Sequence, residues 1–166
     1  MLAKRKQIKG LNENEGSMKL IKINPPFYFY FFFLIIVILH LLTPVVKFVY
    51  YPFTLLGIIP ILIGIILNLA ADSSFKKNDT TIKPLLEAKV LITTGVFKIT
   101  RNPMYLGFVL ILLGIAILLG TILPFIVIII FAVFLDIIFI KYEEKKLENI
   151  FESKWHEYKN SVRRWI

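Results

Sequence analysis

Residues 101–144 read RNPMYLGFVLILLGIAILLGTILPFIVIIIFAVFLDIIFIKYEE. A polar turn comes first, and two apolar runs at residues 103–119 and 121–140 then meet at Gly120. About 20 helical residues cross a hydrocarbon core of about 30 Å, so one helix over both runs would overshoot the bilayer. We therefore expect a tight helical hairpin that turns at Gly120 and carries polar residues at both open ends.

Two more apolar runs, at residues 27–46 and 53–71, come before this hairpin. In lipid every backbone amide needs an internal partner, so these runs are expected to be helices. The sequence predicts an all-α integral membrane bundle of four transmembrane helices. It forms a single domain at residues 25–166, after a polar N-terminal tail at residues 1–24.

The basic residues are distributed unevenly. Of the 20 lysines and arginines, 19 fall in residues 1–26, 72–103 and 141–166, and Lys47 is the exception. By the positive-inside rule this places both termini in the cytoplasm. The net charge of +9 is then explained by topology and anionic membrane lipids rather than by a nucleic-acid partner.

Metal and thiol chemistry are not expected. The chain has no cysteine, which excludes thiolate metal sites and cysteine nucleophiles. Its two histidines are far apart in the sequence, and His40, inside an apolar run, is typical of a hydrogen bond between helices.

Two polar regions flank the hairpin. Residues 72–100 are too polar for the lipid core; within them, residues 76–84 are expected to form an ordered loop and residues 85–91 a short interfacial element. After residue 140, apolar residues recur at three- and four-residue spacing, which predicts a cytoplasmic amphipathic helix that lies on the membrane or folds back over the bundle. These apolar residues are Leu147, Ile150, Phe151, Trp155, Tyr158 and Val162.

The start of the third run has two interpretations. Asn102 is a favoured helix N-cap and Pro103 suits the first helical position, so the segment could simply begin a span, with Arg101 reaching lipid phosphates. Alternatively, the free helix amides and the Arg101 guanidinium form an anion site. Tyr105, three residues after Asn102, is expected near the same face.

Acidic residues at the far end of the hairpin are also ambiguous. Adjacent helical residues point about 100° apart, so Glu143 and Glu144 are not expected to act as an acid/base pair on one bond. Either they form a solvated exit balanced by neighbouring lysines, or one faces inward and binds ribose hydroxyls or a cation. Asp136, about two turns deeper, indicates either a functional site or a hydrogen-bonded packing residue.

Four ordered segments carry a family pattern. They are TTIKP at 80–84, LITTGVF at 91–97, TRNPMYLG at 100–107 and EEKKL at 143–147. Together with the ending around Trp155, Tyr158 and Arg163-Arg164, this series resembles the isoprenylcysteine carboxyl methyltransferase family and its relatives among the phospholipid methyltransferases. The resemblance covers roughly residues 57–164.

The resemblance implies an integral membrane methyltransferase that uses S-adenosylmethionine. Its cofactor would lie at the cytoplasmic boundary within residues 80–166, and a lipid-like or prenylated acceptor would come from the bilayer. By motif position, the catalytic residues would be Arg101, Asn102, Tyr105 and Glu144. The cofactor-binding residues would be Thr94, Gly95, Arg101, Asn102, Pro103, Tyr105, Leu106, Glu143 and Glu144.

Some features of the sequence leave alternatives open. Asn102 stands where many relatives carry histidine, and asparagine cannot act as a base. The acceptor atom could be a carboxylate oxygen, an amine nitrogen or a thiolate sulfur, and the oligomeric state is open. A membrane reductase that uses NADPH and a non-enzymatic membrane scaffold are the two alternative functions.

Overall fold

The computed structural model describes residues 24–42, 47–78 and 90–166, which are largely helical. The predicted N-terminal tail and the TTIKP motif lie outside the described residues, apart from Asn24. In chain order the elements are α2 (Pro25–Leu42), η1 (Phe53–Gly57), α3 (Ile58–Lys77), η2 (Gly95–Lys98), α4 (Pro103–Leu119), α5 (Leu123–Leu135), η3 (Asp136–Ile140) and α6 (Lys141–Ser161). The elements η1 and η2 are 3₁₀ turns, and η3 is a π-helical turn.

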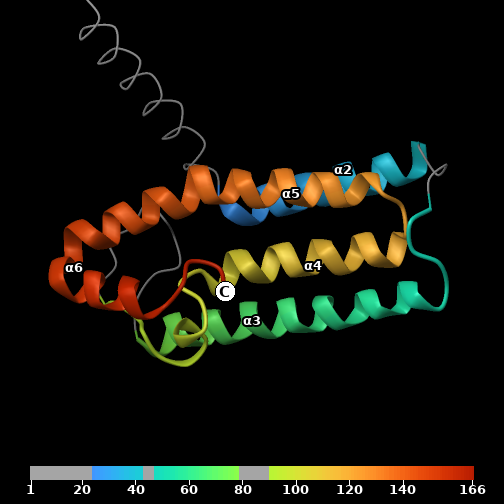
Figure 1. Ribbon diagram of the computed structural model, residues 1–166. Helices are drawn as coiled ribbons and strands as arrows, with labels where there is room; N and C mark the ends of the chain where they lie inside the picture. The colour runs from blue at the N-terminus through green and yellow to red at the C-terminus, as the bar shows by residue number, and fades with distance from the viewer. Residues whose placement is uncertain (1–23, 43–46, 79–89) are drawn as a thin grey trace, which may run out of the picture.

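The long helices lie side by side as a bundle. Figure 1 shows α4 between α3 on one side and the pair α2 and α5 on the other, while α6 bends away and returns toward the start of α4. Three stretches, Pro25–Leu42, Phe53–Lys77 and Leu123–Ser161, are long and apolar enough to cross a membrane, and Pro103–Leu119 is a shorter apolar helix. The all-helical prediction is confirmed for the described residues.

The predicted hairpin turn is confirmed. Helix α4 ends at Leu119, and Gly120 follows in the left-handed conformation with φ +71°. The backbone amides of Phe48 and Val49 both donate to the Gly120 carbonyl, at 2.7 and 3.0 Å. A Cβ at Gly120 would lie 2.5 Å from the Val49 carbonyl oxygen, so the turn needs glycine for its conformation and for this close approach.

Helix α3 continues beyond the apolar run to Lys77, so the predicted ordered loop does not begin at Lys76, and residues 79–84 of that loop lie outside the described residues. Local polar contacts support this last turn and a half. Asp72 pairs with Lys76 at 2.6 Å in i,i+4 geometry, and the Ser74 hydroxyl donates to the Ala70 carbonyl at 2.8 Å. Polar side chains that pair with each other and with the helix backbone in this way allow the helix to extend beyond the apolar core.

Glycines set the distance between α3 and α4. The faces of Gly64 and Gly107 meet, since a Cβ on Gly64 would lie 2.5 Å from the Gly107 carbonyl oxygen, and one on Gly107 would lie 2.8 Å from that of Gly64. About two helical turns away along both helices, Gly57 and Gly114 meet in the same reciprocal way. Small residues let membrane helices approach backbone to backbone, so this ladder fixes α4 against α3.

A second contact joins α2 to the α4–α5 turn. The His40 ring Nδ1 and the Thr121 hydroxyl are 3.1 Å apart, so the hydrogen bond predicted for His40 is formed to a turn residue rather than to another helix. The core below it is built from fully buried aromatic and aliphatic side chains, with Phe131, Phe139 and Leu112 at its centre.

Helix α6 does not run straight. Glu152 has φ 43° and ψ −111°, and this kink turns the second half of the helix back toward the bundle. Trp155 and Tyr158 are thereby buried against Phe97 and Ala71. The Tyr158 hydroxyl donates to the Phe97 carbonyl at 2.7 Å, so the end of α6 is hydrogen-bonded to η2.

Replacing Gly64 by valine is expected to lower the free energy of unfolding by about 1–3 kcal/mol, because the new side chain overlaps the Gly107 backbone. Thermal unfolding in detergent measures this. The matched control is Leu62→Val on the same helix, where the side chain is 54% exposed and the change should be small. Equal unfolding midpoints for Gly64→Val and the wild type would contradict the tight packing.

Candidate functional site

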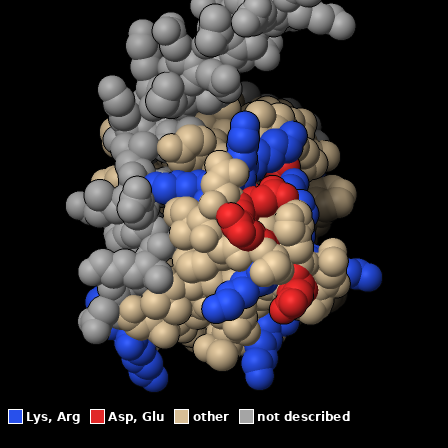
Figure 2. Space-filling view, turned by 90° about the vertical axis from the view of Figure 1, so that its left-hand side faces the viewer, with Lys and Arg blue, Asp and Glu red and all other residues tan. Residues whose placement is uncertain are grey.

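The polar end of the bundle brings together segments that are far apart in the sequence. Figure 2 looks onto this end, where basic side chains surround a smaller group of acidic ones. Helix α4 begins here at Pro103, as predicted. Asn102 occupies the N-cap position, as predicted, but its side chain makes no capping hydrogen bond; its Nδ2 donates to the Arg164 carbonyl at 3.0 Å.

Arg101 is buried at this end, with 7% of its side chain exposed. One terminal nitrogen pairs with Glu144 Oε1 at 3.0 Å, and the other donates to the Lys159 carbonyl at 2.9 Å. Its guanidinium carbon lies 5.6 Å from the centre of the Trp155 ring, within the range of a cation–π contact. Burial among these groups holds the guanidinium in one place and excludes lipid snorkelling for it.

The Glu144 carboxylate is shared between two arginines. Besides Arg101, it accepts from Arg164 Nη2 at 2.6 Å and from Arg164 Nε at 3.2 Å. Hydrogen bonding to Glu144 is the main cause that raises the pKa of Arg164. Glu144, predicted as a catalytic residue, is therefore occupied by ion pairs in this structure.

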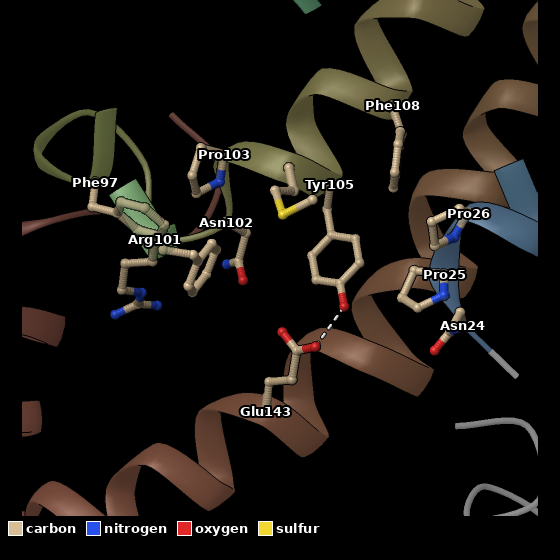
Figure 3. Close-up of a pocket in the computed structure, with 12 residues that line it drawn as sticks. Asn24, Pro25, Pro26, Phe97, Arg101, Asn102, Pro103, Tyr105, Phe108 and Glu143 are labelled. Carbon is tan, nitrogen blue, oxygen red and sulfur yellow. Dashed lines mark hydrogen bonds between the residues drawn. The ribbon is translucent and has the colours of Figure 1, made fainter. Parts of the chain in front are cut away.

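Glu143 faces the other way. Its Oε1 accepts a hydrogen bond from the Tyr105 hydroxyl at 2.6 Å, which joins α6 to the first turn of α4 (Figure 3). The apolar part of the hairpin ends at Ile140, so Glu143 lies just beyond it. Burial raises the pKa of Glu143 to about 7, although the Tyr105 hydrogen bond and Lys146 oppose this shift.

A pocket of about 220 Å³ opens beside this pair, and we call it the central pocket. Figure 3 shows Tyr105 and Glu143 meeting within it, with Arg101 and Asn102 on one side and the start of α2 on the other. Its walls are mostly apolar with a few polar groups, as in most ligand sites. The lining residues that the argument uses are Pro25, Pro26, Arg101, Asn102, Tyr105 and Glu143.

Two further pockets adjoin the central one. The first, about 100 Å³ and here called the inner pocket, shares Arg101, Asn102 and Glu143 with it and is closed by Trp155 and Tyr158. The second, about 360 Å³ and here called the groove, lies between α2, α3 and α4. The groove shares Pro26, Met104 and Phe108 with the central pocket, so the three spaces form a series from α6 to the apolar face.

The structure brings most of the predicted site residues together at the pockets and leaves the others outside them. Arg101, Asn102, Pro103, Tyr105 and Glu143 line the central pocket, and Glu144 lines the inner pocket. Thr94 and Gly95 are exposed at the start of η2, and Leu106 is buried in α4; these three do not line any of the three described pockets.

Several residues of the site were not predicted. The start of α2 had no motif to identify it, although Asn24-Pro25-Pro26 is a visible break before the first run. Arg164 was noted only as part of the family-like ending, with no role at the site. Trp155 and Tyr158 were noted as apolar positions of an amphipathic helix and as part of the family-like ending, with no role at the site. Their closeness to Arg101 depends on the kink at Glu152, which no periodicity indicates.

The structure is therefore an apolar helical bundle with a polar, pocketed end. The sequence profile of the phospholipid methyltransferase family matches residues 52–154, well over half of the chain. The chain therefore belongs to this family of membrane methyltransferases, and the predicted relationship is confirmed. No curated protein and no solved structure shows a significant match to the chain.

The raised pKa of Glu143 predicts a pH dependence of stability. Its usual value is 4.5 and its folded value about 7, so between these values the folded chain holds a proton that the unfolded chain has lost. The free energy of unfolding should therefore fall as pH rises through this window, by at most about 1.4 kcal/mol per pH unit. Glu143→Gln should remove this fall.

Thermal unfolding in detergent at several pH values between about 4.5 and 7 is the measurement. Glu157→Gln, which changes an exposed carboxylate on the same helix, serves as the control and should keep the wild-type dependence. If Glu143→Gln retains the full wild-type dependence, the burial argument for Glu143 is wrong.

Proposed function

We propose that the chain is an S-adenosylmethionine-dependent methyltransferase that acts on a lipid-like acceptor at the cytoplasmic boundary of the membrane. Two buried donors carry this proposal. Arg101 Nε and Trp155 Nε1 lack a hydrogen-bond partner within the described residues, and both residues line the inner pocket. Buried N–H groups in folded proteins are nearly always paired, so this wall calls for a ligand rich in acceptor oxygens.

The proposed topology has four spans with both termini in the cytoplasm. In this proposal the shorter helix α4 also crosses the membrane and brings the number of spans to four, since it is apolar and the glycine ladder holds it against α3. The polar end that carries the site then faces the cytoplasm, in agreement with the distribution of basic residues. Anionic lipid headgroups surround this end.

The inner and central pockets together suit the cofactor. Neither alone reaches the roughly 300 Å³ at which ligand pockets begin, but they share a wall and join at Arg101 and Asn102. The carboxylate and ribose oxygens of S-adenosylmethionine supply the acceptors that Arg101 and Trp155 need. Aromatic rings of Trp155 and Tyr158 offer a flat apolar surface for the adenine.

The groove suits the acceptor chain. It is lined mainly by apolar side chains of α2, α3 and α4, with Asn68 and Asp72 as its polar members, and leads to the central pocket at Pro26 and Phe108. A lipid that enters it from the bilayer carries its headgroup to Tyr105 and Glu143. Cofactor and acceptor therefore meet in the central pocket from opposite ends.

The chemistry needs alignment more than a nucleophilic side chain. When bound, S-adenosylmethionine supplies an electrophilic methyl carbon whose bond to sulfur breaks as the acceptor bond forms. Arg101 and Asn102 hold one partner and Tyr105 and Glu143 the other, so the reacting atoms are brought into line. The apolar walls exclude water, which would compete with the acceptor.

The charges of the site favour an amine nitrogen as the acceptor atom. An anionic acceptor needs a cation, but Arg101 is already paired with Glu144, and its remaining donor is assigned to the cofactor in this proposal. The carboxylate that faces the central pocket is Glu143, with a pKa of about 7. It attracts an ammonium headgroup, accepts one of its protons and leaves the nitrogen lone pair free to take the methyl group.

Binding of S-adenosylhomocysteine to the detergent-purified protein, measured by calorimetry, tests the cofactor. Arg101→Ala should weaken binding at least tenfold, since it removes a buried cation and donor. Trp155→Phe keeps the ring but loses the unpaired Nε1 donor, and should weaken binding about three- to tenfold.

Arg163→Ala is the control for these variants, because the exposed Arg163 side chain lies outside the described pockets. It should bind as the wild type does. A folded wild type that does not bind S-adenosylhomocysteine would contradict the proposed function. Wild-type affinity in both Arg101→Ala and Trp155→Phe would contradict the placement of the cofactor.

Methyl transfer in lipid nanodiscs tests the acceptor. A phospholipid with a primary amine headgroup should be methylated, and a prenylated cysteine carboxylate should not. Glu143→Gln should lower the turnover of the amine at least about 100-fold, because a general base contributes about 10²–10⁴ to the rate. Tyr105→Phe, which frees the Glu143 carboxylate to move, should have a smaller effect.

Glu157→Gln again provides the control and should keep wild-type turnover. Methylation of the carboxylate in preference to the amine would overturn the nitrogen assignment. Full activity of Glu143→Gln toward the amine would show that another group takes the proton.

A further inference from the structure

The segment after α6 returns across the start of α4. Its backbone carbonyls hold three consecutive residues there. The Arg163 carbonyl accepts from the Arg101 amide at 3.1 Å, and the Arg164 carbonyl accepts from the Thr100 hydroxyl at 3.1 Å and from Asn102 Nδ2 at 3.0 Å. The position of Arg164 therefore determines where Arg101 and Asn102 lie.

The Arg164 side chain is itself held between two carboxylates. Two of its nitrogens contact Glu144, and its Nη1 lies 3.3 Å from both carboxylate oxygens of Asp136. Trp165 Nε1 also donates to Asp136 Oδ1 at 3.3 Å. Asp136 thus binds two consecutive side chains of the returning segment.

Asp136 occupies an unusual place in the hairpin. It begins the π-helical turn η3, between the apolar residues of α5 and the polar residues of α6. Turns of this kind inside α-helices are frequent at functional sites. A carboxylate at this depth costs free energy unless it is paired, and Arg164 and Trp165 supply the pairing.

We propose that Asp136 is a positioning residue for the cofactor site, which acts through Arg164 on Glu144 and Arg101. This inference rests on the proposed function. Asp136, Arg164, Glu144 and Arg101 form a chain of alternating charge, and the last of them carries the unpaired donor that faces the inner pocket. Asp136 lines none of the described pockets and does not touch the cofactor in this scheme.

The mechanism of positioning is electrostatic. With both carboxylates present, Arg164 divides its contacts between Asp136 and Glu144, and Glu144 also pairs with Arg101 at 3.0 Å. When the charge of Asp136 is lost, Arg164 has only Glu144 as its anion and pulls it away from Arg101. The Arg164 backbone shifts with its side chain, and the hydrogen bonds to Asn102 and Thr100 shift as well.

Asp136→Asn tests this proposal, because asparagine keeps the shape of the side chain and its acceptor oxygen. Calorimetry should show S-adenosylhomocysteine binding about fivefold more weakly than to the wild type, within the range of coupling energies for contacting charges. The KM for S-adenosylmethionine should rise by a similar factor, while the KM for the acceptor stays unchanged. A purely structural role would lower the active fraction and leave both KM values unchanged.

A double-mutant cycle with Arg164→Lys identifies the route. Lysine keeps the charge but cannot bridge both carboxylates through a planar fork. Arg164→Lys alone should weaken binding to a similar extent, and adding Asp136→Asn should then cost little more. If the two substitutions weaken binding independently, so that their fold-changes multiply in the double variant, the proposal is overturned. If Asp136→Asn does not fold, Arg164→Lys alone decides, and wild-type affinity in it overturns the proposal.

Glu148→Gln is the matched control. It also converts a paired carboxylate to an amide, but its partner is His156 at 3.4 Å on the outer part of α6. Its affinity should equal that of the wild type. If Asp136→Asn binds S-adenosylhomocysteine as tightly as the wild type does, only the positioning role is overturned. If the wild type itself does not bind it, the proposed function is overturned.

Discussion

The buried Glu144 carboxylate is the constraint on which the polar end of this protein depends. A charge removed from water is costly unless it is paired and hydrogen-bonded, and here two guanidiniums share it. One comes from the start of α4 and the other from the segment after α6. Because both arginines bind the same buried carboxylate, three segments separated in sequence are held in one arrangement.

The bundle gives this arrangement a rigid base. Backbone contact between Gly64 and Gly107 fixes α4 against α3, and Pro103 begins α4 directly beside Asn102. The family profile covers residues 52–154, which includes this helix pair and the glutamates. The start of α2 and the residues after 154 lie outside it, yet they close the pockets. Residues of the matched part and of the unmatched ends therefore line the pockets together.

The sequence predicted the elements of this fold better than their contacts. Apolar runs and Gly120 gave the helices and the hairpin, since these depend on local composition and on lipid as solvent. The motifs identified Arg101, Asn102, Tyr105 and Glu143, which meet in the central pocket. The Glu144–Arg164 pairing was not predictable, because it requires the kink at Glu152, where a non-glycine residue takes a positive φ. Adjacent glutamates were equally ambiguous until their different partners were seen.

The same burial that immobilises Glu144 makes Glu143 chemically useful. Both carboxylates sit at the boundary where α6 leaves the apolar hairpin, but Glu144 has two arginines and Glu143 has a tyrosine. A neutral hydroxyl offsets the loss of hydration only in part, so the pKa of Glu143 rises to about 7, close to the value that suits a proton acceptor at neutral pH. Two neighbouring residues of one type thus have different partners because they face different sides of α6, and the proposed proton-acceptor role of Glu143 rests on this difference.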